Sequence, residues 1–199
     1  MINFQILMAG GIIMIPLSIL AIIALAIIID KLFFIIKFAK CPQSLQQLTN
    51  NHPINLSELN SLLSKINSQN CFYNFFNCLN HHHQQKSLEN AMISEAKIIE
   101  KKLNHNLWLL ETIITSAPLL GLLGTIFGMS SAFKIIGNDT TLNASGITAG
   151  VAESLIATAF GLIIAVFTLF AFNYFVKIQT QILDEMEILA NKIGNQISK

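Results

Sequence analysis

Residues 140–176 read TTLNASGITAGVAESLIATAFGLIIAVFTLFAFNYFV, an apolar and small-residue run in which Glu153 is the only charged side chain. An α-helix rises about 1.5 Å per residue, so a helix of this length exceeds the roughly 30 Å hydrocarbon core of a bilayer. The run predicts a transmembrane helix that projects beyond the membrane. An ionisable group there costs roughly 2.5 kcal/mol or more to insert, which makes Glu153 the first candidate for a functional residue. The alternative is a carboxyl at the outer headgroups, without a special role.

Small and hydroxyl-bearing residues form a stripe on this predicted helix. They recur at intervals of three and four residues, which places them on one face of a helix. The members of this stripe are Ser154, Thr158, Gly161, Ala165 and Thr168. Ala157 begins a second lane of small residues, which continues through Gly161 and Ala165. Small side chains let membrane helices approach closely, and hydroxyls bond across the contact. For the alanines and Gly161, helix packing alone explains the pattern equally well.

The composition is typical of a membrane protein. Of 199 residues, 53% are hydrophobic and only 12% are charged, which is too apolar for an ordinary soluble domain. The formal net charge of +1 gives no argument for a nucleic-acid partner or an acidic substrate. Every basic residue is Lys, which excludes bidentate guanidinium recognition. The three cysteines suit a reduced cytosol better than a disulfide framework.

Three apolar runs predict an all-α, polytopic membrane protein. The predicted transmembrane helices are 6–29, 112–136 and 148–176. They are joined by a cytoplasmic helical region, 30–111, and a periplasmic loop, 137–147, and they are followed by a cytoplasmic helical tail, 177–199. We expect the first run to be a retained span rather than a cleaved leader, because no Lys or Arg precedes it and its apolar part is too long.

The lysines predict the orientation. Cytoplasmic segments of membrane proteins carry an excess of Lys and Arg. The lysines on the predicted cytoplasmic side are Lys31, Lys37, Lys40, Lys65, Lys86, Lys97, Lys101, Lys102, Lys177, Lys192 and Lys199. Lys134 alone lies at the outer side. This asymmetry predicts a periplasmic N-terminus and a cytoplasmic C-terminus.

The polar region after the first span contains candidate helices and a histidine run. Residues 56–66 predict a short amphipathic helix, and the aromatic-rich segment 71–79 is expected to pack in a small cytoplasmic core. Three successive histidines, 81–83, point in three directions on a helix and have no Cys or carboxylate at ligand spacing, so a solvated turn is the better interpretation than a metal site. Cys71 and Cys78 are seven residues apart, which favours core thiols over a zinc knuckle.

A clear amphipathic helix begins at Leu88. Its apolar positions keep the three-four spacing and are Leu88, Met92, Ala96, Ile99, Leu103, Leu107 and Leu110. We expect this helix to continue without a break into the second span, with Trp108 near the membrane interface. After Lys177, the third helix is expected to continue through Ile178, Ile182, Met186, Leu189 and Ile193.

The second span has a small-residue face of its own. Its members have the spacing seen on the third span and are Pro118, Gly121, Thr125, Gly128 and Ala132. The pair Gly124 and Gly128 forms a G-x-x-x-G pattern that permits close helix approach. These small residues predict that the second span can pack closely against another helix.

Two segments carry a resemblance to a known family. Residues 117–129, APLLGLLGTIFGM, resemble the second-span signature of the ExbB/TolQ (MotA/TolQ/ExbB) proton-channel family. Residues 150–162, GVAESLIATAFGL, followed by Asn173, resemble its third-span signature. The order of the spans and the loop sizes agree along nearly the whole chain, which is most similar to the ExbB type. One departure is Val166-Phe167, where the family usually has Pro, so a straighter third helix is expected.

The resemblance implies a channel and motor subunit of the bacterial inner membrane. Family members form pentamers around two copies of a single-span partner of the ExbD/TolR type, and proton flow drives work on TonB or TolA. The positions that match the family's proton pathway are Glu153, Thr158 and Thr125. No metal or cofactor is implied. A helix turns about 100° per residue, so Thr158 lies about 140° from Glu153 and the two cannot share one stripe of a single helix.

Three functional hypotheses compete. The leading one is an ExbB-like proton channel that couples the proton motive force to TonB-dependent outer-membrane transport, with a TolQ-like subunit that energises TolA as its close alternative. The second is a passive scaffold whose Glu153 pairs with a partner's lysine. The third, an intramembrane enzyme, is disfavoured because the spans contain no histidine, no paired carboxylates and no nucleophile with a base. Whether Na⁺ replaces H⁺ stays open at this stage.

Overall fold

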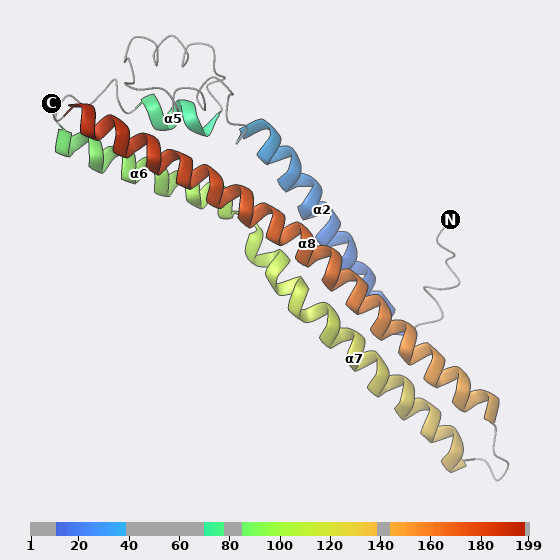
Figure 1. Cartoon of the computed structure of the whole chain (residues 1–199). Coiled ribbons are helices and arrows are strands. Elements are labelled where there is room, and N and C mark those ends of the chain that lie inside the picture. The colour runs from blue at the N-terminus through green and yellow to red at the C-terminus, as the bar shows by residue number, and fades with distance from the viewer. Residues whose placement is uncertain (1–10, 39–69, 78–84, 139–143, 198–199) are drawn as a thin grey trace. The chain divides into compact units, whose positions relative to one another are not determined.

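The computed structural model describes residues 11–38, 70–77, 85–138 and 144–197. Within these ranges the chain is helical and has no strand. The helices are α2 (Met14–Phe38), α5 (Cys71–Asn77), α6 (Gln85–Asn104), α7 (Leu107–Asn138) and α8 (Ala144–Ile197), as Figure 1 shows. The predicted all-α fold is confirmed.

Three stretches are long and apolar enough to cross a membrane. They are Met14–Phe38, Asn90–Phe133 and Gly146–Asn191. Large apolar side chains stay exposed on them, among them Phe167 and Phe170, each 72% exposed. Soluble proteins rarely leave so much apolar surface in water, and these side chains therefore face lipid or other helices. The chain is a multi-pass membrane protein. The predicted membrane boundaries and domain limits stay predictions.

The described helices divide into two compact units. The first unit takes its residues from 1–28 and 106–173, and the second takes its residues from 29–105 and 174–199. The apolar core of the first unit joins the start of α2, the first turns of α7 and the middle of α8. Its buried members include Ile13, Met14, Leu17, Ile113, Ala117, Ala157, Ile164 and Ala165.

The core of the second unit is rich in aromatic side chains. Phe72, Phe75 and Phe76 of α5 are almost fully buried. They pack with residues of α6 and α8 that share one face of each helix, namely Met92, Ile99, Leu103, Ile182, Met186 and Leu189. The backbone N–H of Phe72 donates a hydrogen bond of 3.0 Å to Asn70 Oδ1, which caps the first turn of α5. The predicted aromatic core therefore exists, and the amphipathic faces of α6 and α8 cover it.

The expectation of one unbroken helix from Leu88 into the second span is wrong. α6 ends at Asn104 and α7 begins at Leu107, with a turn at His105 and Asn106 between them. Asn106 has φ 65°, in the left-handed region that Asn adopts more readily than most residues. The Lys31 ammonium of α2 donates to the carbonyls of Leu103 and His105, which satisfies acceptors that the end of a helix leaves open.

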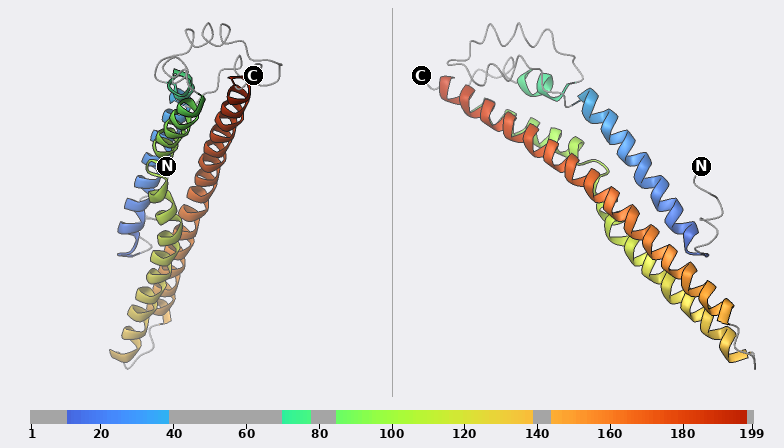
Figure 2. Two further views of the ribbon diagram at one scale, coloured as in Figure 1. Left: turned by 90° about the vertical axis from the view of Figure 1, so that its left-hand side faces the viewer. Right: turned by 45° about the vertical axis from the view of Figure 1, so that its right-hand side comes forward.

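α8 runs for 54 residues through Val166 and Phe167 without a break. The straighter third helix expected from the missing proline stays a prediction. The two further views in Figure 2 show the same continuous helix, coloured from orange to red. The predicted helix at residues 56–66, the histidines 81–83 and the thiols Cys41 and Cys78 lie outside the described residues.

Candidate functional site

α7 and α8 lie side by side in the first unit, and glycines occupy their contact (Figure 1). A β-carbon added at Gly121 would lie 3.0 Å from Thr158 Cα, and one at Gly124 would lie 2.7 Å from Ala157 Cβ. At Gly161 it would lie 2.5 Å from the carbonyl oxygen of Ala117. Atoms cannot approach so closely without movement, so the two helices pack at a separation that larger residues would prevent.

The remaining predicted packing residues lie in or beside the same contact. A β-carbon at Gly128 would lie 2.6 Å from Ser154 Cβ. Ala157 and Ala165 are buried in the core of the first unit, and Pro118 is half-buried inside α7. The small-residue lanes read from the sequence therefore meet one another in the structure.

Thr158 connects the two helices by a hydrogen bond. Its hydroxyl donates to the carbonyl oxygen of Gly121 on α7, at 2.8 Å. The approach that Gly121 permits brings this carbonyl within reach. Thr125 behaves differently, because its hydroxyl donates at 2.7 Å to Leu122 in its own helix. Both threonines are half-buried, and each hydroxyl oxygen still has lone pairs that can accept from water.

Glu153 meets a different neighbour. Its half-buried carboxyl lies against Gly11, the residue that leads into α2. A β-carbon at Gly11 would overlap Oε1 of Glu153. Thus Glu153 faces the start of α2, whereas Thr158 bonds to α7, as their separation of about 140° around α8 requires. Sequence reasoning missed Gly11, although the Gly10-Gly11 pair before an apolar run is a turn signal.

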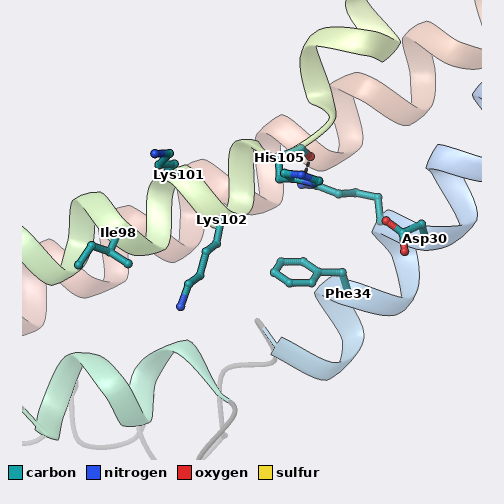
Figure 3. A pocket seen from close by; sticks show the side chains of 7 residues that line it. Asp30, Phe34, Ile98, Lys101, Lys102 and His105 are labelled. Atoms are coloured by element: carbon teal, nitrogen blue, oxygen red, sulfur yellow. Dashed lines mark hydrogen bonds between the residues drawn. The ribbon is translucent and has the colours of Figure 1, made fainter.

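The second unit contains a pocket between α2 and α6, shown in Figure 3. Its volume is about 500 Å³, and its lining residues are Asp30, Lys31, Phe34, Ile98, Lys101, Lys102 and His105. Lys31 is 4% exposed, and its ammonium lies 5.6 Å from the centre of the Phe34 ring. This ammonium donates to the end of α6, so Lys31 acts there as a helix cap. The sequence alone predicts only that Lys31 lies on the cytoplasmic side, and it does not predict the cap.

The fold and the small-residue contact define a class of protein, a multi-pass helical membrane protein with a carboxyl in an apolar helix. A family model for the MotA/TolQ/ExbB proton channel family matches residues 57–188. The chain belongs to this family.

Individual relatives carry the ExbB name, and the chain is ExbB-like. It is 31% identical over 186 residues to putative biopolymer transport protein ExbB-like 3 of Synechocystis sp., covering 84% of this chain and 82% of that protein. It is 39% identical over 87 residues to biopolymer transport protein ExbB of Aquifex aeolicus, covering 43% of this chain and 59% of the relative. It is 35% identical over 92 residues to biopolymer transport protein ExbB of Xanthomonas campestris pv. campestris, covering 46% of this chain and 36% of the relative.

Proposed function

We propose that this chain is the channel subunit of an ExbB-type motor in a bacterial inner membrane, and that it couples the proton motive force to TonB-dependent outer-membrane transport. Membership of the proton channel family supports the channel role. The relatives named biopolymer transport protein ExbB favour the ExbB type over the TolQ type.

The observation that carries the proposal is the position of Glu153. It is the only acidic residue of α8 between Gly146 and Val176, and it lies in the first unit within a group of three helices. An ionisable side chain in a membrane span is costly and is by default a candidate for a functional role such as binding protons. In this proposal the carboxylate accepts a proton from one side of the membrane and releases it to the other. The cycle makes and breaks only O–H bonds, so the chain is not an enzyme.

The two threonines support the same path. The hydroxyls of Thr125 and Thr158 lie on α7 and α8 and satisfy their donors on backbone carbonyls. Their oxygens remain available as acceptors for water, which can hydrate a proton path. We assign them to the lining of the path and Glu153 to the proton-carrying step.

One chain with three membrane-spanning helices cannot enclose a pore, so we propose a closed ring of identical subunits, a pentamer. The exposed aromatic side chains of α8, Phe167 and Phe170, offer apolar surface to neighbouring helices or lipid. A single-span partner of the ExbD type and a client of the TonB type complete the machine. Its orientation has a periplasmic N-terminus and a cytoplasmic C-terminus, because the lysines concentrate on the segments assigned to the cytoplasm.

Growth on a ferric siderophore as the only iron source tests the coupling. Cells that lack the native gene receive wild type, Glu153→Gln or Glu111→Gln. Glu111 is an exposed acid on α7 and serves as the matched control. We expect Glu153→Gln to accumulate normally and to abolish growth, and Glu111→Gln to grow like wild type. Normal growth of Glu153→Gln would refute the proposal.

A further inference from the structure

Gly11 has an unusual backbone conformation at the entrance to α2. Its φ is +69°, a left-handed value that residues with a β-carbon rarely adopt. Its carbonyl oxygen accepts the hydrogen bond from Met14 N–H at 3.0 Å, which begins the first turn of the helix. Gly11 is therefore a fixed part of the helix start, and its conformation sets how the chain enters α2.

The space beside Gly11 is filled by the carboxyl end of Glu153. A β-carbon on Gly11 would overlap Oε1, and it would lie 3.1 Å from Cδ and 3.6 Å from Cγ of Glu153. Three atoms of one side chain thus occupy the volume that any other residue at position 11 would need. The three heavy atoms nearest to the added carbon all belong to Glu153.

The packing below this contact holds the two helices together. Ala157 follows Glu153 by one helical turn on the same face of α8 and is fully buried. Ala157 belongs to the same apolar core as Ile13 and Leu17 of α2. The start of α2 is therefore packed against the face of α8 that carries Glu153.

We propose that Gly11 is a positioning residue for Glu153, and that the start of α2 forms one wall of the proton-binding site. This inference rests on the proposed function. Because Gly11 has no side chain and its backbone adopts a left-handed conformation, the carboxyl of Glu153 lies against the backbone at the start of α2. A larger residue at position 11 would displace the carboxyl from the place where it exchanges its proton, while α7 and its contact with Thr158 remain as they are.

Proton flux through the complex with its single-span partner tests the inference. The complex is reconstituted in liposomes that contain a trapped pH-sensitive dye. We expect Gly11→Ala to lower the flux by about tenfold or more, because a displacement of about 1 Å of a reacting group has effects of this size. Gly11→Asn separates the effect of the contact with Glu153 from the effect of the positive φ at position 11. Asn tolerates positive φ better than Ala but also has a β-carbon, so it should lower the flux to a similar extent.

The decisive comparison uses the shorter acid. Glu153→Asp withdraws the carboxyl by one CH₂ from position 11. Although its own flux is low, adding Gly11→Ala should lower that flux much less than it lowers the flux of the wild type, which is the coupling that a double-mutant cycle measures. Backbone strain alone would be unchanged by Glu153→Asp and would give equal losses in both backgrounds. Equal losses, or wild-type flux in Gly11→Ala, would overturn the inference.

The outcomes separate this inference from the proposed function. If Glu153→Gln conducts protons normally, the proposed function fails. If Glu153→Gln is inactive while Gly11→Ala conducts normally, only the role of Gly11 fails. Where Gly11→Ala does not accumulate, the same comparison is made on the amount of assembled complex. Recovery in the Glu153→Asp background supports the contact, and equal loss contradicts it.

Discussion

At the scale of single residues, Thr158 joins α7 to α8 through one hydroxyl. This hydroxyl donates to Gly121 across the helix contact, whereas the hydroxyls of Ser154 and Thr168 donate to carbonyls of their own helix. An interhelical bond of this kind contributes about 0.5–1.5 kcal/mol. It therefore stabilises the register of the two helices without being essential for their association.

Thr158→Ala should have a mild effect. We expect a loss of about 1 kcal/mol of stability and a partial loss of proton flux, because water can take the place of the hydroxyl in a hydrated path. Thr158→Ser keeps the hydroxyl and should retain nearly full flux. The comparison is made in liposomes against Glu153→Gln. A loss in Thr158→Ala as complete as that of Glu153→Gln would show that Thr158 takes a direct part in proton transfer.

Cys71 gives a pH-dependent prediction. Burial raises the pKa of its thiol to about 12, well above the ordinary value of about 8.5. The thiolate is the reactive form, so iodoacetamide should modify Cys71 very slowly at pH 8 in the folded protein and quickly after denaturation. Peptide mass spectrometry follows the modification.

The raised pKa of Cys71 also affects stability. Between these two pKa values the folded protein keeps the thiol proton, whereas the unfolded chain loses it. The contribution of Cys71 to the free energy of unfolding is therefore constant below about pH 8.5 and declines as the pH rises towards 12. Rapid modification of folded protein at pH 8 would contradict the burial of Cys71.

At the scale of helices, the contact between α7 and α8 depends on residues without side chains. Gly128 lies where a β-carbon would meet Ser154 Cβ at 2.6 Å and the carbonyl oxygen of Gly150 at 3.0 Å. Two neighbours on the facing helix restrict the same position. Additional volume there has to separate the helices.

Gly128→Leu should weaken assembly. Overpacking of this kind costs about 1–3 kcal/mol, so we expect a lower thermal midpoint and less assembled complex. Ser130→Leu is the matched control, because Ser130 is a small residue on the exposed part of the same helix. Size-exclusion chromatography in detergent with a thermal ramp measures both. If Gly128→Leu assembles as stably as Ser130→Leu, the close contact does not exist in the protein.

The end of α6 depends on a residue from another helix. Lys31→Met keeps an apolar side chain of similar length but removes the ammonium that caps Leu103 and His105. Because hydrogen bonds to charged groups contribute about 1.5–3 kcal/mol, the last turn of α6 should exchange its amide hydrogens faster. Lys37→Met, at an exposed position of α2, is the control. Unchanged hydrogen exchange at residues 101–105 would rule out the cap.

The helices were predictable where one chain segment alone determines them. Six of the predicted periodic positions are buried in one core, because a helical period of 3.6 residues places them on one face of each helix; they are Met92, Ile99 and Leu103 of α6 and Ile182, Met186 and Leu189 of α8. The break at His105 and Asn106 was not predictable from periodicity, since its cap comes from Lys31, 72 residues earlier than Leu103. The neighbour of Glu153 was hidden for the same reason, because Gly11 meets it only when α2 packs on α8.

At the scale of the whole molecule, the proposed machine needs more than this chain. Glu153 is the only acidic residue between Gly146 and Val176, and continuous transfer needs a second group to accept the proton that Glu153 releases. We expect this group to be an acidic residue, such as Asp, on the single-span partner. In the proposed ring, each subunit contributes one Glu153 around the proposed partner.

Proton flux in liposomes, with and without the single-span partner, is the most direct test of Glu153 as the proton carrier. The account predicts sustained flux for the wild-type complex, little flux for the chain alone, and none for the complex that carries Glu153→Gln, which should assemble normally. Glu153→Asp should retain a trace, because it is shorter by one CH₂ but still titrates. Sustained flux through the assembled Glu153→Gln complex would contradict the account and favour the scaffold interpretation.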